Sequence, residues 1–329
     1  MARWISFTDL IALQHLHARG IQLDLERAVL WPHTPIQAAL SAHIPLNAIG
    51  AETIVAYSAS SRALGFLQMR ARRGRPEADV VFLAPALEND SDAVAIWYRL
   101  LAASAKEIGA RGGQRLFAQI AAGNGIEDVF RQAGFNAFAH DDVYRLDALP
   151  PNLIKTKILR HQRARDGWNL LRLYAEFAPR SVQIAEGMLS PQGQGGKLGD
   201  WWDQSSGAGY ILEIDGEIAG AVRVRRGRAA YWLRFWLHPQ AEDQGDNLVL
   251  GALALLHSAP HRPVYCNVRD YESGLRGALD MLGFRHLQTR SLLIKHTTAR
   301  VKAPILKLMP ALEKRPEPAR SVSQHSESS

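Results

Sequence analysis

Cysteine is almost absent from this chain, because Cys266 is the only one in 329 residues. A single thiol excludes an intrachain disulfide and is too little for a zinc cluster, and the 12 histidines include no HExxH pair. Cys266 lies in an apolar segment, so we expect it to be a small core side chain. The composition therefore predicts a protein of a reducing compartment whose fold depends on packing.

Long apolar runs are also missing. The longest, residues 248–256, is well short of the roughly 20 residues that a membrane-spanning helix needs. The N-terminal segment is interrupted by Thr8, Asp9 and Gln14, so it lacks the apolar centre of a signal peptide. We expect a soluble, cytoplasmic protein without a membrane partner.

Motifs for several other functions are absent as well. In the Gly-rich segment 193–199, Leu198 stands where a Walker loop has the Ser or Thr that binds magnesium, and the sequence has no G-x-S-x-G elbow. The net charge of +7 favours anionic partners. The basic residues are scattered, however, and no motif of stacking aromatics accompanies them, so we do not expect nucleic acid to be the partner.

What the sequence does contain is a strand, a polar loop and a buried helix in its second half. Residues 230–237 are rich in aromatic and aliphatic side chains, as in a buried strand, and Pro239 ends strand pairing. Asp246 or Asn247 is placed to cap the next helix, whose residues 248–256 are apolar almost all round. A helix that starts directly after a strand offers free N–H groups, and these suit a phosphate.

The remaining pattern predicts an α/β (α+β) protein in which helices alternate with short strands. In the first half we expect helices at 9–18, 23–40 (interrupted by prolines), 93–108 and 127–133, and strands at 53–57, 64–70, 79–83, 115–120 and 142–146. In the second half we expect helices at 168–178, 181–188, 248–256 and 275–282, and strands at 210–214, 218–225, 230–237, 264–268 and 291–295. The dipeptide Asp215-Gly216 predicts a two-residue hairpin, and the basic stretch 155–165 predicts a helical linker or an opening helix.

Two landmarks recur at nearly the same spacing. Pro85 and Pro239, each after an expected strand, are 154 residues apart, and the dipeptides Gly134-Phe135 and Gly283-Phe284 are 149 apart. One loop can absorb the difference, so we interpret the chain as two copies of one unit. We place an N-terminal domain at 1–150 and a C-terminal domain at 151–300, followed by a tail at 301–329 whose composition predicts disorder.

The order of these elements resembles the GNAT superfamily of acyl-CoA N-acyltransferases. FRQAGF (130–135) and LDMLGF (279–284) resemble that family's closing helix and Gly-Phe turn, and GEIAGAVRVR (216–225) resembles its second and third strands. Asn124 stands about where the family often has an Asn after its fifth strand. Two such units resemble a tandem GNAT protein of the mycothiol synthase type. The resemblance implies two GNAT-like units, each with a mixed, mostly antiparallel sheet flanked by helices.

The resemblance also implies a reaction. GNAT enzymes move an acyl group directly from acyl-CoA to an amine, so positioning carries most of the rate. A backbone N–H of the splayed fourth strand polarises the thioester carbonyl, which here implicates Phe235, Trp236 and Leu237. We expect an N-acyltransferase, and first of all an N-acetyltransferase, with acetyl-CoA or another acyl-CoA as co-substrate. The expected acceptor is a small-molecule or peptide amine, and the expected assembly is a monomer or a homodimer.

In the family, the CoA pyrophosphate binds a loop of the pattern Q/R-x-x-G-x-G/A, and neither half keeps this loop intact. Residues 86–92, ALENDSD, contain no glycine, so we expect the first half to be degenerate. The second half offers Gln244, Gly245, Asp246 and Asn247 as cofactor-binding candidates, with an ordinary loop and helix cap as the alternative. Both loops are acidic, which disfavours a phosphate unless the carboxylates point away.

The family's catalytic tyrosine is missing too. Its usual position, four residues before the Gly of Gly-Phe, is Phe130 in one half and Leu279 in the other. Tyr271 is the candidate substitute as proton donor, and a half-buried tyrosine without a catalytic role is the alternative. Glu213 is the candidate base, although the alternation along its strand also fits a solvent-facing residue.

A second hypothesis belongs to a different class of protein. Because the loops and tyrosines are altered in both halves, the chain would be a catalytically degenerate GNAT-fold protein that binds or scaffolds a peptide or another protein. Trp201-Trp202, after the Gly-rich segment, either contribute to such a recognition surface or pack in the core. Of the two halves, the second is the better candidate for a working site, because it keeps Gly245.

Overall fold

The computed structural model describes residues 2–6, 9–42, 50–60, 62–72, 75–123, 125–151, 153, 157–187 and 207–297. Asn124, Trp201-Trp202, the Gly-rich segment 193–199 and the tail from 301 lie outside the described residues. Among the helices that the structure describes, none is long and apolar enough to cross a membrane.

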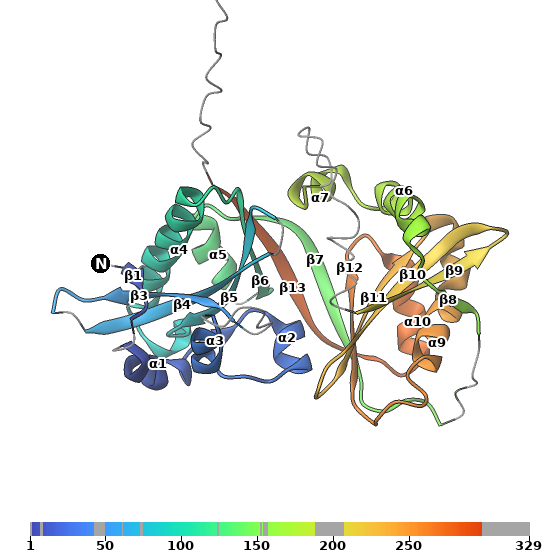
Figure 1. Cartoon of the computed structure of the whole chain (residues 1–329), viewed down its shortest axis with the longest axis horizontal. Coiled ribbons are helices and arrows are strands. Elements are labelled where there is room, and N and C mark those ends of the chain that lie inside the picture. The colour runs from blue at the N-terminus through green and yellow to red at the C-terminus, as the bar shows by residue number, and fades with distance from the viewer. Residues whose placement is uncertain are drawn as a thin grey trace, which may run out of the picture. The chain divides into compact units, whose positions relative to one another are not determined.

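The described strands form a single sheet. They are β1 (Ala2–Trp4), β2 (Ile21–Gln22), β3 (Glu52–Tyr57), β4 (Ala63–Ala71), β5 (Glu77–Ala84), β6 (Arg115–Ala121), β7 (Asn136–Leu146), β8 (Leu159–His161), β9 (Ala208–Ile214), β10 (Glu217–Arg226), β11 (Tyr231–Leu237), β12 (Val264–Arg269) and β13 (Arg285–His296). The order across the sheet is β1-β3-β4-β5-β6-β13-β7-β12-β11-β10-β9-β8, with β2 beside β5 (Figure 1). The pairs β5/β6 and β11/β12 are parallel, and the other described pairs are antiparallel. The predicted mixed, mostly antiparallel sheet is confirmed.

Helices cover both faces of this sheet. The α-helices are α1 (Leu10–His17), α2 (Leu25–Leu30), α3 (Pro35–Ser41), α4 (Ala93–Ala110), α5 (Ile126–Gln132), α6 (Gly167–Phe177), α7 (Arg180–Ala185), α9 (Gly245–Ala254) and α10 (Arg276–Met281), and the 3-10 helices are η2 (Leu87–Asn89), η3 (Ala164–Asp166), η5 (Pro239–Gln244) and η6 (Ser273–Leu275). On β13, Leu293 packs into the core of α4 and α5, whereas its neighbour Leu292 packs against Val182 of α7. Because neighbouring strand side chains point to opposite faces, α5 and α7 lie on opposite sides of the sheet.

Local sequence explains several element boundaries. Thr34 and Gln37 form a capping box at the start of α3, in which each side chain accepts a hydrogen bond from the other residue's N–H at 3.2 and 2.9 Å. Between β9 and β10, Asp215 and Gly216 have φ angles of 51° and 83°. Two successive left-handed residues suit a tight hairpin turn of the kind that Asp-Gly favours, so the predicted hairpin is confirmed.

The same helix ending occurs in both halves. Phe135 N–H donates to Phe130 O and Gly134 N–H to Arg131 O, at 3.0 and 2.9 Å. At the end of α10, Phe284 and Gly283 N–H make the corresponding bonds at 3.0 and 3.1 Å, and both glycines are left-handed. These bonds define a Schellman motif, which explains why each helix ends at the same Gly-Phe pair.

The last strands of the two halves change places. β13, from the end of the second half, pairs with β6 of the first half, and β7, from the end of the first half, pairs with β12 of the second. β7 and β13 also pair with each other in the middle of the sheet, where Figure 1 shows them in green and red. Each half therefore supplies a strand that borders the other half's parallel strand pair.

Two local predictions are wrong. The basic stretch 155–165 is not an α-helix in its described part, because it contains β8, an edge strand that pairs with β9, and ends in the short 3-10 helix η3. Its Arg160 forms ion pairs with Glu213 of β9 and with Asp166, so this positive charge helps to hold β8 at the edge of the sheet. The helix-cap prediction also fails, because α9 begins at Gly245 directly after η5 and has no side-chain cap bond, which leaves Asp246 and Asn247 inside its first turn.

Candidate active site

The sheet splits at corresponding places in the two halves. β11 and β12 pair in parallel only as far as Arg234↔Asn267, and β11 then continues for three residues. β5 and β6 pair only as far as Val80↔Ala118, and β5 then continues for four residues. Arg234 and Val80 are 154 residues apart, the same offset that separates the two prolines after these strands. The split between parallel strands is therefore part of the duplicated unit.

In the first half, this split is filled by the chain itself. β2 pairs antiparallel with β5 through Ile21↔Leu83 and Gln22↔Phe82. The other edge of β5 is already paired with β4, so β2 occupies the edge that β6 leaves. The approach is close, because a Cβ atom on Gly20 would lie 2.4 Å from the Phe82 ring. A ligand at this split would have to displace β2.

In the second half, the backbone of Leu237 faces the split. Tyr231 N–H donates toward the β12 side, to Pro263 O at 3.0 Å, and His238 N–H donates to the β10 side at 2.8 Å. Backbone groups alternate between the two edges of a strand, so the N–H of Leu237 points to the same side as that of Tyr231. β12 has already diverged there, and this N–H has no strand partner among the described residues.

The side chains of the three candidate strand residues belong to the core. Phe235 packs in the cluster that contains α9, and Trp236 packs on the opposite face against α6, where its ring lies 5.6 Å from that of Tyr174 and 5.9 Å from that of Phe177. Phe235, Trp236 and Leu237 are all buried. Only their backbone can therefore take part in a reaction at the split.

In the loop after β11, several backbone N–H groups make hydrogen bonds within the loop itself. It forms η5, in which Ala241 N–H donates to His238 O at 2.8 Å and Gly245 N–H donates to Glu242 O. Gln240 N–H donates to the Nδ1 atom of His238 at 3.1 Å. The amides of Gln240, Ala241 and Gly245 therefore already have acceptors and are not free for a pyrophosphate.

Gly245 itself is explained by packing. A Cβ atom at this position would lie 2.9 Å from the carbonyl oxygen of Gly274 in η6, so any other residue would force the backbone to shift. If Gly245 is the first glycine of the family pattern, the Q/R position three residues earlier is Glu242, which carries the wrong charge for a phosphate. Gln244 accepts from Asn247 at 2.9 Å within the helix start. Glu242 and the three bonded amides are therefore unsuited to a pyrophosphate, and the cofactor role of Gln244, Gly245, Asp246 and Asn247 stays a prediction.

The two catalytic candidates are separated. Tyr271 follows β12, is half-buried, and packs against the cluster that contains Trp236, so it lies close to the split. Burial raises the pKa of Tyr271, which keeps its phenol protonated. Glu213 lies on β9, two strands and therefore about 10 Å from β11, and its carboxylate is bound by Arg160 at 2.5 Å. The structure brings Tyr271, but not Glu213, to the strand residues.

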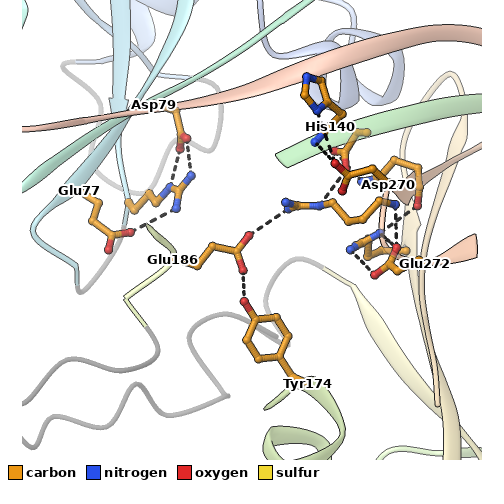
Figure 2. A network of polar contacts seen from close by, with 12 residues as sticks. Glu77, Asp79, His140, Tyr174, Glu186, Asp270 and Glu272 are labelled. Atoms are coloured by element: carbon orange, nitrogen blue, oxygen red, sulfur yellow. Dashed lines mark hydrogen bonds and ion pairs between the residues drawn. The ribbon is translucent and has the colours of Figure 1, made fainter. Parts of the chain in front are cut away.

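A buried polar network lies on the face of the sheet that α7 covers (Figure 2). Arg269, at the end of β12, is held between Asp141 of β7, with Nε–Oδ1 2.8 Å, and Glu186 after α7, with Nη2–Oε1 3.0 Å. The O–H of Tyr174 donates to the other oxygen of Glu186 at 2.5 Å. Burial, and then Glu186, raise the pKa of Tyr174. The network ties α6 and α7 to strands from both halves.

A second charged pair lies beside it. Arg234 of β11 donates to both carboxylate oxygens of Glu272 at 2.7 and 2.8 Å, a bidentate arrangement that is strong in a buried place. Glu272 is 7% exposed, and burial raises its pKa although Arg234 opposes the shift. Glu272 directly follows Tyr271, and Arg234 is the last residue of β11 that pairs with β12. The ion pair therefore holds the segment that carries Tyr271 against the end of the β11/β12 pairing.

Most of this network was not predicted from the sequence. Glu186, Arg269 and Asp141 come from segments that lie far apart in the chain, and no local motif links them. Arg234 did give a signal, because a lone charge in a strand of large apolar side chains requires a buried partner. That reasoning would have pointed to an acid near the strand's end without naming Glu272.

An open cavity of about 510 Å³ lies past the end of β11. α6, the β9–β10 hairpin and η5 line it, and its charged or titratable lining residues are Arg172, Glu176, Glu217, His238 and Asp243. The Nε2 atom of His238 is 2.7 Å from Glu176. His238, which lines this cavity, directly follows Leu237, so the cavity lies next to the end of β11.

The solved structures that are similar to this chain include two that cover most of it. A GCN5-related N-acetyltransferase from Sphaerobacter thermophilus is 14% identical with a TM-score of 0.55, over 90% of this chain and 95% of that protein. A tandem GNAT protein from the clavulanic acid biosynthesis pathway is 13% identical with a TM-score of 0.50, over 90% and 99% of the two chains. No protein-family model and no curated protein sequence matches. Together with the duplicated strand split, these likenesses show that the chain has the GNAT fold in a tandem layout.

Proposed function

We propose that the chain is an N-acyltransferase, and first of all an N-acetyltransferase, with its site in the second half. The observation that carries this proposal is the asymmetry between the two strand splits. Leu83 and Leu237 stand two residues before the corresponding prolines, and Leu83 is paired with Ile21 of β2. The N–H of Leu237 faces a split without a strand partner among the described residues. The extended end of acyl-CoA that carries the acyl group can make hydrogen bonds to β11 at this edge, as β2 does to β5.

The reaction follows from this placement. The thioester carbonyl oxygen of acetyl-CoA, or of another acyl-CoA, accepts a hydrogen bond from Leu237 N–H, which stabilises the oxyanion as the amine attacks. The C–N bond forms, the C–S bond breaks, and the amine proton leaves to a carboxylate or to water. Tyr271, which packs against the cluster that contains Trp236 and whose pKa burial raises, supplies a proton to the leaving thiolate.

The acceptor is an amine, and the cavity past β11 suits a cation. Glu176, Glu217 and Asp243 line it, against Arg172 as its one permanent positive charge in the described lining. We assign the acyl end of acyl-CoA to the edge of β11. We assign no residue to the diphosphate, because the amides of Gln240, Ala241 and Gly245 already have acceptors.

A matched pair of variants tests the role of Leu237. Leu237→Ala removes the side chain and keeps the N–H, whereas Leu237→Pro removes both. The N–H makes no strand bond, so proline costs no ladder bond at this edge. With acetyl-CoA and a panel of primary amines, release of the CoA thiol should fall by about 100- to 1000-fold in kcat from the alanine to the proline variant. Equal rates in two folded variants would refute the assignment.

The second candidate function is a GNAT-fold binding protein without catalysis. The closed η5 amides and the filled first split favour it. It predicts no release of the CoA thiol from acetyl-CoA with any amine of the panel. A thermal titration of the whole chain tests for an acyl-CoA site, because saturation to about 100 times Kd would raise the free energy of unfolding by about 2.7 kcal/mol. Turnover with the amine panel then decides between the two functions.

A further inference from the structure

The place where the two halves meet contains a second cavity, of about 230 Å³. We call it the junction cavity, and its lining residues are Arg72, Phe117, Ala118, Gln119, Phe138, Glu186, Arg269 and Leu292. They come from the end of β4, from β6, β7, β12 and β13, and from the end of α7. It is distinct from the open cavity past β11, with which it shares no lining residue.

Arg269 lines the junction cavity and has a buried donor without a hydrogen-bond partner among the described residues. Its Nη2 atom donates to Glu186 at 3.0 Å, and its Nε atom lies 2.8 Å from Asp141 in an ion pair without hydrogen-bond geometry. Its Nη1 atom is buried and has no hydrogen-bond partner among the described residues, and the whole residue is 8% exposed. A buried donor without an acceptor is destabilising, so this N–H group favours a ligand that brings an acceptor oxygen.

The rest of the lining suits a flat, apolar body. Phe117 and Phe138 meet edge to face with their ring centres 6.2 Å apart, and Leu292 is buried beside them. The guanidinium of Arg72 lies over the Phe117 ring at 3.9 Å and is itself paired with Asp79 at 2.6 Å. The ring and the guanidinium plane together make a surface on which a planar group can stack.

Gln119 adds a second donor. Its Oε1 atom accepts a hydrogen bond from Arg290 at 3.0 Å, and this bond directs the Nε2 amide away from Arg290. The lining therefore contains N–H groups of Arg269 and Gln119, two aromatic rings, and one carboxylate, Glu186, whose oxygens already accept from Arg269 and Tyr174.

We propose that the junction cavity binds a small planar carboxylate with an aromatic body. The carboxylate accepts from Arg269 Nη1, and the ring lies against Phe117 and Phe138. The volume allows it, because a cavity of about 150 Å³ is enough for benzene. This site goes beyond the acyl-transfer reaction and does not depend on it, since the readout is binding alone.

Benzoate, benzamide and benzylamine are the probes, measured by isothermal titration with the whole chain. The three compounds share a ring and differ in the group that meets Arg269. Benzoate brings a negative charge and acceptor oxygens, benzamide brings a neutral acceptor, and benzylamine brings a positive charge without an acceptor. Benzoate should bind, benzamide should bind at least 10-fold more weakly, and benzylamine should not bind. Phe138→Trp fills the cavity without changing its charge and should abolish benzoate binding.

Arg269→Lys keeps the charge and removes the fork, so it should weaken benzoate binding at least 10-fold. Arg70→Lys is the matched control, because Arg70 forms a comparable half-buried pair with Asp24 outside the cavity, and it should leave binding unchanged. If Arg269→Lys does not fold, Phe138→Trp still decides the location. Absence of benzoate binding at 10 mM, equal binding of benzylamine, or unchanged binding in folded Phe138→Trp would each overturn the proposal.

Discussion

Replacing Gly245 by alanine tests the contact that closes the start of α9. The added Cβ atom would lie 2.9 Å from the carbonyl oxygen of Gly274, which belongs to the backbone of η6 and cannot rotate away. It would also approach Ala278 and Leu237, both at 3.7 Å, which are ordinary contact distances. The strain therefore falls on one contact between η6 and α9.

The expected change in the free energy of unfolding on Gly245→Ala is the cost of the close contact minus the gain in helix propensity. Overpacking of this kind costs about 1–3 kcal/mol, because the backbone on one side must shift. Alanine gains up to about 1 kcal/mol over glycine in a helix, and Gly245 is already helical with φ −54° and ψ −45°. We expect Gly245→Ala to lower the free energy of unfolding by about 1–2 kcal/mol.

Gly277 provides the matched control. It lies in α10, is exposed, and a Cβ atom there meets nothing within 4 Å. Gly277→Ala should therefore raise the free energy of unfolding by about 0.5–1 kcal/mol. Urea unfolding of both variants beside the parent chain measures the two changes. A Gly245→Ala variant as stable as Gly277→Ala would refute the packing explanation and return Gly245 to the role of a loop glycine that faces a ligand.

Three further outcomes are expected. Tyr174→Phe should cost about 1–3 kcal/mol in urea unfolding, because Glu186 loses a buried donor at 2.5 Å, and a change below 0.5 kcal/mol would contradict the network. Burial raises the pKa of Cys266, so above about pH 8.5 the unfolded thiol ionises while the folded one does not. The free energy of unfolding should then fall by up to about 1.4 kcal/mol per pH unit. Cys266→Ala should reduce this fall in a series of urea unfolding curves, and an unchanged slope against pH would refute the effect of Cys266. Gly20→Ala should displace β2 from β5, cost about 2–3 kcal/mol and speed proteolysis between α1 and α2, and normal stability would show that β2 does not fill the first split.

The sequence predicted those parts of the fold that short-range patterns control. The Asp215-Gly216 hairpin has the expected left-handed residues, and the two Gly-Phe pairs end their helices by the same hydrogen bonds. The expected strands after Pro150 fall on β9 to β13, although β13 is longer than the expected 291–295. These features depend on the backbone freedom of glycine and on the alternation of side chains, both of which a sequence displays directly.

The candidate site was harder to predict because it depends on pairing between distant segments. Nothing near Ile21 indicates that a two-residue strand would lie on β5 at Leu83. The stretch around Arg160 looked helical by its charge, but Glu213 and Asp166 hold it as an edge strand. Glu186 and Arg269 are 83 residues apart, and their ion pair exists only because α7 packs on the central strands.

The exchange of β7 and β13 explains how the first half can support the second split although β2 fills the split of the first half. β12 carries one side of the second split, and its other edge is paired along its length with β7, from Val264↔Leu146 to Arg269↔Asp141. Without the first half, β12 would become an edge strand, and Arg269 would lose Asp141 while keeping its charge in a buried place, which is strongly destabilising. The first half is thus required for the geometry of the second split, even though β2 occupies its own split. Isolated residues 151–300 should therefore not reproduce the acetyl-CoA binding or the acyl transfer that we propose for the whole chain, and full activity of that fragment would contradict this dependence.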